Sequence, residues 1–178
     1  MHKKIEVIIS GFGGQGVVLA GEILGRAAAY EGKYVVQTQS YGAEARGSTA
    51  MSEVIISDSK IGFPKVRKCD ILVTMSQNAL EANLKHLKEK GVLIVDKDKV
   101  AHLPETKARV FEIPSTKTAA KLFKSRLYAN VIMLGALSKV TGIVKEKTIE
   151  KAIIDTVPEA SREANVRSFR KGLKLVTP

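Results

Sequence analysis

A glycine-rich turn between an apolar run and a helix-like stretch is the feature that most constrains the fold of this chain. Residues 11–16 read Gly-Phe-Gly-Gly-Gln-Gly, directly after the apolar run 5–9 and directly before the helical pattern 17–30. This is the G-x-G-x-x-G spacing in a strand–turn–helix context. Glycines there permit a tight turn and leave backbone N–H groups uncovered at a helix N-terminus. The candidate anion-facing residues are therefore Gly11, Gly13, Gly14, Gln15 and Gly16, of which we expect Gly13 and Gly16 to tolerate no bulky side chain.

The glycine turn alone does not identify a dinucleotide site. Such a site needs an acidic residue at the end of the second strand, where it binds the ribose hydroxyls. The second apolar run ends in Gln37-Thr38-Gln39-Ser40 with no carboxylate, and Glu31 precedes that strand. Two interpretations stay open at this point. The chain is a stand-alone Rossmann-like NAD(P)-binding oxidoreductase, or the glycines only let the first helix pack on the first strand.

A second glycine-containing segment has the composition of a functional loop. Residues 39–48 read Gln-Ser-Tyr-Gly-Ala-Glu-Ala-Arg-Gly-Ser and lie between two strand-like runs. The glycines permit positive φ angles, and the guanidinium of Arg46 suits a carboxylate or a phosphate. The alternative is that Glu44 and Arg46 only pair with each other on a turn, which contributes no more than about 1 kcal/mol. The candidate residues of this loop are Tyr41, Gly42, Glu44, Arg46 and Gly47.

The two motifs together resemble a known family. Gly-Phe-Gly-Gly-Gln-Gly followed by Tyr-Gly-Ala-Glu-Ala-Arg-Gly is similar to the gamma subunit, or gamma domain, of 2-oxoacid:ferredoxin oxidoreductases. The resemblance continues through residues 52–57, 70–77 and 130–137. Within the family the second motif is most similar to the 2-oxoglutarate branch. Gamma-type subunits for pyruvate, branched-chain 2-oxoacids or indolepyruvate are the alternatives.

The resemblance implies a function shared with other chains. The complex would decarboxylate a 2-oxoacid oxidatively to an acyl-CoA and pass electrons to ferredoxin, with coenzyme A as co-substrate. Thiamine diphosphate, Mg²⁺ and [4Fe-4S] clusters would be carried by alpha, beta and ferredoxin-like delta subunits. This chain would hold no cofactor, and alone it is not expected to be active. Its glycine turn and its second loop would face coenzyme A or the partner subunits.

Composition and charge narrow the classes of protein to which this chain can belong. The 178 residues, 44% hydrophobic and 26% charged, fit a single domain spanning 1–178. No long apolar run is present and the N-terminus is too short for a signal peptide, so we expect a cytoplasmic location and no membrane contact. The net charge of +11 suits an anionic ligand, an acidic partner or solvated lysines, whereas aromatic residues, at 5%, are too few to favour nucleic acid.

The sequence offers no catalytic group. One cysteine and three histidines, without ligand spacing, predict no metal site and no nucleophile–base pair. Two interpretations of Cys69 are open: a pKa lowered by neighbouring basic residues, or burial. Asn130 interrupts a helical pattern that is otherwise nearly all apolar. If it is buried it must form hydrogen bonds, and we expect it to bind the glycine turn or a partner.

The alternation of elements predicts the fold class. We expect a three-layer α/β/α fold with an open, mostly parallel sheet and a helical C-terminal third. The predicted strands are 5–10, 34–38, 50–57, 71–75, 92–95 and 109–113. The predicted helices are 17–30, one capped by Ser76 and closed by Gly91, 115–124, 127–140, 145–156 and 158–174.

Overall fold

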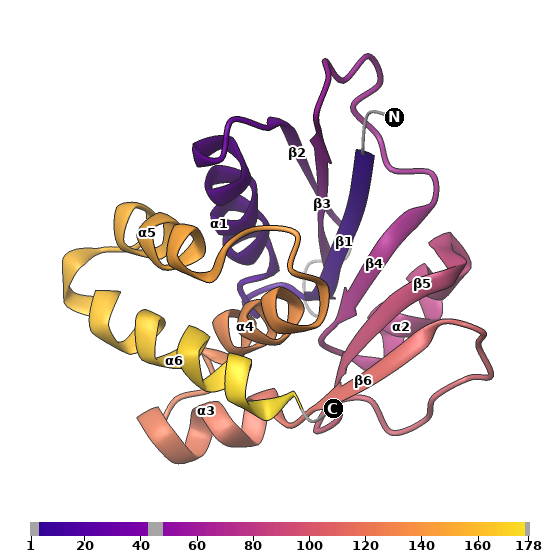
Figure 1. Cartoon of the computed structure of the whole chain (residues 1–178). Helices are drawn as coiled ribbons and strands as arrows, with labels where there is room; N and C mark the ends of the chain where they lie inside the picture. Colours follow the sequence, from indigo (N-terminus) through magenta and orange to yellow (C-terminus); the bar gives the residue numbers. More distant parts are fainter. Residues whose placement is uncertain (1–3, 43–47, 177–178) are drawn as a thin grey trace.

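One mixed sheet of six strands forms the centre of the molecule (Figure 1). The computed structural model describes residues 4–42 and 48–176. Across the sheet the strands follow the order β2-β3-β1-β4-β5-β6. Their bounds are β1 Lys4–Phe12, β2 Tyr34–Tyr41, β3 Thr49–Ser57, β4 Cys69–Thr74, β5 Leu87–Asp96 and β6 Arg109–Ile113. Because β3 is antiparallel to both neighbours and the other pairs are parallel, five strands end at the edge of the sheet where β3 begins.

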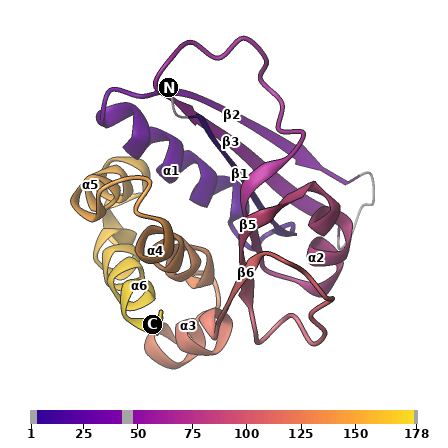
Figure 2. The same ribbon diagram turned by 45° about the vertical axis from the view of Figure 1, so that its right-hand side comes forward.

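The helices cover the two faces of the sheet unequally (Figure 2). One face carries α1 Val17–Tyr30, α3 Ser115–Phe123, α4 Ala129–Thr141, α5 Glu146–Thr156 and α6 Arg162–Leu175. The other carries α2 Gln77–Asn83, which continues into a single 3₁₀ turn at Leu84–His86. A further 3₁₀ turn, Glu159–Ser161, precedes α6. The predicted α/β fold class and the helical C-terminal third are confirmed.

Helix α4 is buried nearly all round because it lies between the sheet and α6. Every residue from Ala129 to Ser138 is buried, which explains why its apolar pattern has no polar stripe. The two helices approach closely where glycines cross. A Cβ built on Gly135 would lie 2.2 Å from the Phe169 carbonyl oxygen, and one on Gly172 would lie 2.0 Å from the Ile132 carbonyl oxygen. Backbone therefore contacts backbone at this crossing.

Several predicted boundaries differ from the structure, and the largest difference follows Ser76. The helix capped by Ser76 does begin there, with the Ala79 N–H donating to the Ser76 hydroxyl at 3.2 Å. It ends at Asn83, however, and β5 begins at Leu87. Leu80 and Leu87 both pack into the core under α2, the first from a helix and the second from a strand, so their spacing resembles that of one continuous helix. Among the described residues, no helix is long and apolar enough to cross a membrane.

Strand β2 also runs further than predicted, through polar residues to Tyr41. The added residues, 39–41, remain in the strand because they pair with β3, from Gln39 opposite Ser52 to Tyr41 opposite Ala50. The polar residues before them are also held by their side chains. The Gln37 amide donates to the Val18 carbonyl at 3.1 Å and to the Ser52 hydroxyl at 3.0 Å. On the other face the Thr38 hydroxyl donates to the Glu53 carboxylate at 3.0 Å. The polar stretch therefore fixes β2 to α1 and β3.

Candidate functional site

The glycine turn joins three strand ends at one edge of the sheet. Gln15 closes it, because its Oε1 accepts from the Phe12 N–H at 2.6 Å and its Nε2 donates to the Met75 carbonyl at 3.0 Å. The Gly13 N–H donates to the Ser48 carbonyl at 3.0 Å. The turn after β1 is thus held to the residue after β4 and to the residue before β3. Gln15 is a structural residue of this turn.

Gly16 is the position at which the turn requires glycine most strongly. Its φ is +73°, in the left-handed region, and it precedes the first residue of α1. Asn130 of α4 donates from Nδ2 to the Gly16 carbonyl at 2.9 Å, and a Cβ on Gly16 would lie 2.3 Å from that nitrogen. Of the two partners expected for Asn130, the structure thus shows the glycine turn.

The other glycines of the turn differ in their need for space. A Cβ on Gly11 would lie 2.4 Å from Gln15 Oε1, so position 11 also has no room for a side chain. At Gly13 the nearest atom is the Ser48 carbonyl oxygen at 3.7 Å, an ordinary contact. A small side chain therefore fits at Gly13, and the steric requirement lies at Gly11 and Gly16. Gly14 has a φ of +88° with no atom near its Cβ position.

The strand order argues against a dinucleotide site of the Rossmann type. Such a site places the end of the second strand next to the glycine turn. Here β3 is inserted between β1 and β2, so β2 lies two strand spacings, about 10 Å, from β1. The residues at the end of β2 carry no carboxylate. The position that would bind the ribose hydroxyls is therefore neither adjacent nor acidic.

The ends of the second predicted loop lie at the same sheet edge as the glycine turn. Tyr41 ends β2 and is 60% exposed, and the Gly42 N–H donates to the Thr49 carbonyl at 2.8 Å. Ser48, at the far end of the loop, contacts Gly13. Glu44, Arg46 and Gly47 lie outside the described residues. The structure thus places the two ends of this loop and leaves the roles of its central residues as predictions.

A small cavity opens beside the glycine turn on the α4 side. Its volume is about 160 Å³, and it is lined by Gly14, Gln15, Met75, Lys99, Thr116, Arg126, Leu127 and Ala129. Lys99 and Arg126 are exposed and form no ion pair with a carboxylate in the described part of the chain. Helices α1 and α4 both begin at this edge without a side-chain cap or an acidic residue in the first turn. Two cations and two uncapped helix N-termini make the cavity suited to an anion.

A third helix N-terminus near this edge is already occupied by carboxylates. The Thr116 hydroxyl of α3 donates to the buried carboxylate of Asp96, and the Lys117 N–H donates to Asp98 at 2.8 Å. Asp98 thus accepts one backbone N–H of the first turn of α3, and the negative charges of the two carboxylates disfavour an external anion there. The anion-binding potential is confined to the starts of α1 and α4.

The sequence interpretation missed Lys99 and Arg126. Lys99 follows β5 and Arg126 precedes α4, so both lie far along the chain from the glycine turn. Their position after a strand and before a helix was a usable signal. Their closeness to Gly14 and Gln15, however, follows from the order of strands in the sheet. That order cannot be predicted from neighbouring residues.

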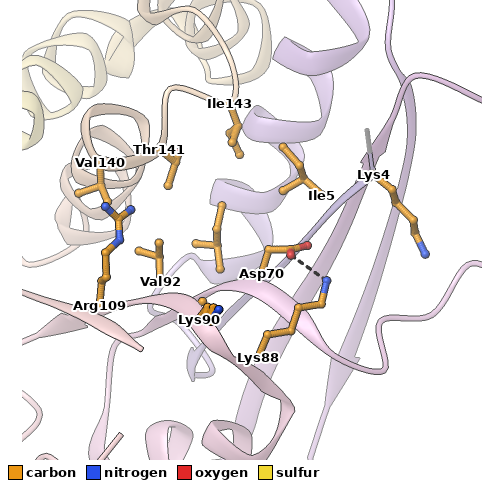
Figure 3. Close-up of a pocket in the computed structure, with 12 residues that line it drawn as sticks. Lys4, Ile5, Asp70, Lys88, Lys90, Val92, Arg109, Val140, Thr141 and Ile143 are labelled. Atoms are coloured by element: carbon orange, nitrogen blue, oxygen red, sulfur yellow. Dashed lines mark hydrogen bonds and ion pairs between the residues drawn. The ribbon is translucent and has the colours of Figure 1, made fainter. Parts of the chain in front are cut away.

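A larger cavity lies at the opposite edge of the sheet, where β1, β4 and β6 begin (Figure 3). Its volume is about 410 Å³, and Ile5, Val92, Val140 and Ile143 line it with apolar side chains. The Lys88 ammonium forms an ion pair with Asp70 at 2.7 Å, as drawn in Figure 3. Among the residues that the structure describes, none from the glycine turn or from the two ends of the second loop lines this cavity.

Cys69 is buried at the start of β4, which decides between its two interpretations. Burial raises the pKa of its thiol to about 12. The thiol is therefore protonated and shielded under ordinary conditions, the reverse of a reactive cysteine. In the described residues no group of three or more His, Cys, Asp or Glu side chains is arranged to hold a metal ion.

We expect the native chain to resist thiol alkylation by iodoacetamide at about pH 8, close to the ordinary thiol pKa. The same chain in urea should react to completion, since the unfolded thiol ionises normally. Because the folded pKa is raised, the unfolded state releases this proton first as pH increases. The contribution of Cys69 to stability should therefore decline above the ordinary thiol pKa and up to about 12. Mass spectrometry of the alkylated chain measures the first effect, and rapid native labelling would contradict it.

Comparisons with known proteins agree in fold and sequence over nearly the whole chain. Residues 6–175 match the profile of the pyruvate ferredoxin/flavodoxin oxidoreductase family. The chain is 50% identical to the 2-oxoglutarate synthase subunit KorC of Methanocaldococcus jannaschii, covering 96% of this chain and 92% of that protein. Its structure matches the gamma subunit of the keto/oxoacid ferredoxin oxidoreductase from Geobacter sulfurreducens with a TM-score of 0.86, at 42% identity and with 96% of each chain covered.

A further structural match contains ligands. The 2-oxoglutarate:ferredoxin oxidoreductase from Magnetococcus marinus, solved with 2-oxoglutarate, coenzyme A and succinyl-CoA bound, aligns at a TM-score of 0.86 and 26% identity. The alignment covers 97% of this chain and 31% of the Magnetococcus chain. The fold described here thus recurs as one part of a longer polypeptide.

Proposed function

Since this chain belongs to the pyruvate ferredoxin/flavodoxin oxidoreductase family, we propose that it acts as the gamma subunit of a 2-oxoacid:ferredoxin oxidoreductase of the 2-oxoglutarate type. The observation that carries this proposal is the 50% identity to a 2-oxoglutarate synthase subunit across nearly all of both chains. The complex decarboxylates the 2-oxoacid oxidatively, forms an acyl-CoA and transfers electrons to ferredoxin. This chain contributes a surface to that reaction rather than a reacting group.

The surface it contributes is the edge of the sheet that holds the glycine turn. A coenzyme A molecule carries several phosphate oxygens, and the cavity beside Gly14 offers the cations Lys99 and Arg126 with the N-termini of α1 and α4. The Magnetococcus structure, with coenzyme A bound, supports coenzyme A as the anion of this family. In this assignment Lys99 and Arg126 bind and orient the phosphates, and Gly14 lets the backbone approach them.

The remaining cofactors belong to other chains of the complex. A [4Fe-4S] cluster takes four cysteine ligands, and this chain has one cysteine, which is buried. Thiamine diphosphate with Mg²⁺ and the clusters are therefore assigned to alpha, beta and ferredoxin-like delta subunits, with ferredoxin as the acceptor. The loop containing Tyr41, Gly42, Glu44, Arg46 and Gly47 is assigned to the side that meets those subunits or coenzyme A, since both of its ends lie beside the glycine turn.

In the assembled complex, we expect Arg126→Ala to raise the KM for coenzyme A by about tenfold or more, the value of a charge-assisted hydrogen bond. Lys99→Ala should act in the same direction, whereas the KM for the 2-oxoacid should stay unchanged. Lys97→Ala is the matched control, because Lys97 is an exposed neighbour that does not line the cavity. Steady-state kinetics with a viologen dye measures each constant.

Two outcomes would contradict these assignments separately. If the KM for coenzyme A is unchanged in both cavity variants, the assignment of the cavity to coenzyme A is wrong, whereas the assignment of the chain as a gamma subunit is unaffected. Oxoacid-dependent dye reduction by the purified chain alone removes the subunit assignment. Arg46→Ala, measured alongside, distinguishes the two roles of the second loop. A raised KM indicates contact with coenzyme A, and weakened assembly indicates contact with a partner.

A further inference from the structure

The outer edge of β2 is unpaired in the described structure. Strand β2 forms hydrogen bonds with β3 on one side and has no strand on the other, as the sheet order and Figure 2 show. Its pairing with β3 is continuous over all eight residues, from Tyr34 opposite Ser57 to Tyr41 opposite Ala50, with no register shift. A long, regular edge of this kind presents a row of free backbone donors and acceptors.

Strand β2 lacks the features with which proteins usually block such an edge. Its sequence, Tyr-Val-Val-Gln-Thr-Gln-Ser-Tyr, contains no charged residue and no proline, in a chain with a net charge of +11. The opposite edge, β6, is five residues long and carries Arg109 and Glu112. Short length and charge are common protections of an edge strand, so β6 is protected and β2 is open to pairing.

The alternation of an antiparallel pair identifies the free groups on β2. The Gly42 N–H donates to the Thr49 carbonyl, so residues 42, 40, 38 and 36 direct their backbone groups toward β3. The intervening residues, Val35, Gln37, Gln39 and Tyr41, therefore direct theirs outward. A strand that adds to β2 must bond to these four residues.

We propose that two copies of this chain pair along β2 in an antiparallel arrangement, about a two-fold axis at Thr38. This register lets the outward residues bond to one another while using the full strand. Val35 then lies opposite Tyr41 of the other copy, and Gln37 lies opposite Gln39. At the centre the two Thr38 residues face each other as a pair without mutual hydrogen bonds. The result is one sheet running through both copies.

The distribution of charge favours a second copy as the occupant. Residues 1–60 carry six Lys or Arg and six Asp or Glu, so the whole net charge of +11 lies in residues 61–178. Two ion pairs lie near β2 in the described part of the chain: Lys33 binds Asp58 at 2.6 Å, and Arg26 binds Glu22 at 3.1 Å. Two strongly basic copies therefore approach with least repulsion along β2.

The arrangement leaves the proposed coenzyme A cavity free in each copy. Antiparallel pairing points the glycine turns of the two copies in opposite directions along the strands. One strand pair buries less than the roughly 1,000 Å² of a stable interface, so we expect a weak association, measurable at about 100 µM protein. The inference does not depend on the function proposed above, since it rests on β2 and on charge alone.

The two-fold axis at Thr38 permits a sharp test by disulfide formation. In Thr38→Cys the two introduced thiols face each other in a pair whose Cα atoms are about 4.5 Å apart, within disulfide range. We expect a covalent dimer on mild oxidation, and Cys69 does not interfere because it is buried. Ser40→Cys is the matched control on the same strand, because its two copies would lie about 13 Å apart along the strands.

A second pair of variants tests the association without a covalent bond. Gln39→Lys adds charge beside the axis and should abolish the dimer in sedimentation equilibrium, whereas Leu122→Lys adds the same charge on exposed α3 and should leave it unchanged. A monomer at all concentrations, with no faster cross-linking of Thr38→Cys than of Ser40→Cys, overturns the proposal. A second result also overturns the proposal, in favour of a strand from another subunit. In that case the outward β2 amides are protected from hydrogen exchange only when other subunits are bound, and Thr38→Cys forms no disulfide.

Discussion

Replacing Gly172 with alanine is expected to lower the free energy of unfolding by about 3 kcal/mol, and leucine at this position should prevent folding. The cause is the crossing of α4 and α6, where a Cβ on Gly172 would lie 2.0 Å from the Ile132 carbonyl oxygen and 3.0 Å from the Gly135 Cα. These are backbone atoms of a buried helix, so no side chain can rotate away. The helices must separate instead, and the packing between them is lost.

Urea unfolding of the purified chain measures this effect. For a domain of this size, a loss of 3 kcal/mol corresponds to a fall in Tm of about 6–12 °C. Gly62→Ala is the matched control, since no atom lies within 4 Å of its Cβ position and its φ is not positive. The control should stay within about 0.5 kcal/mol of the wild type. A Gly172→Ala chain as stable as the control would show that the helix crossing can open without cost.

The second large effect is expected at Gly16. Gly16→Ala must place a side chain at a φ of +73°, which costs about 1–2 kcal/mol, and bring its Cβ against Asn130. Asn130 is buried and cannot move without breaking its hydrogen bond to the Gly16 carbonyl. We expect a total loss of about 3 kcal/mol, together with weaker binding of coenzyme A by the complex. Gly13→Ala is the matched control, because its Cβ has room.

A double-mutant cycle separates the two contributions at Gly16. In the background Asn130→Ala the clash is absent, so Gly16→Ala should cost only the backbone strain. The difference between the two backgrounds is the interaction of position 16 with Asn130. Additive effects of the two substitutions would contradict the close contact that the structure places there.

Local patterns predicted the elements whose partners lie nearby in the chain. Helix α1 has the predicted bounds Val17–Tyr30, and β6 has the predicted bounds Arg109–Ile113, because periodicity and turn residues define them locally. The stretch from Ser76 to Gly91 was assigned wrongly to a single helix, since Leu80 and Leu87 reach the same core from a helix and a strand. Hydrophobic periodicity indicates which residues are buried together, but a helix and a strand can both contribute residues to the same buried face.

The candidate site was predicted only as far as adjacent residues define it. The glycine turn is a local feature, and its hydrogen bonds confirm a tight strand–turn–helix junction. The insertion of β3 between β1 and β2 depends on pairing between distant segments, as does the arrival of Lys99 and Arg126 at the turn. Those contacts follow from the order of strands, which no single motif encodes.

The hydrogen bond from Asn130 to Gly16 also sets an order of events while the chain is being made. It spans 114 positions, and Asn130 is held in place by a helix that α6 must cover. About 45 residues are added between Asn130 and the end of α6, which takes a ribosome a few seconds. During that interval the glycine turn exists without its anchor. A chain that stops before α6 therefore exposes an unanchored turn and an uncovered apolar helix, so that the glycine turn is complete only in chains that extend through α6.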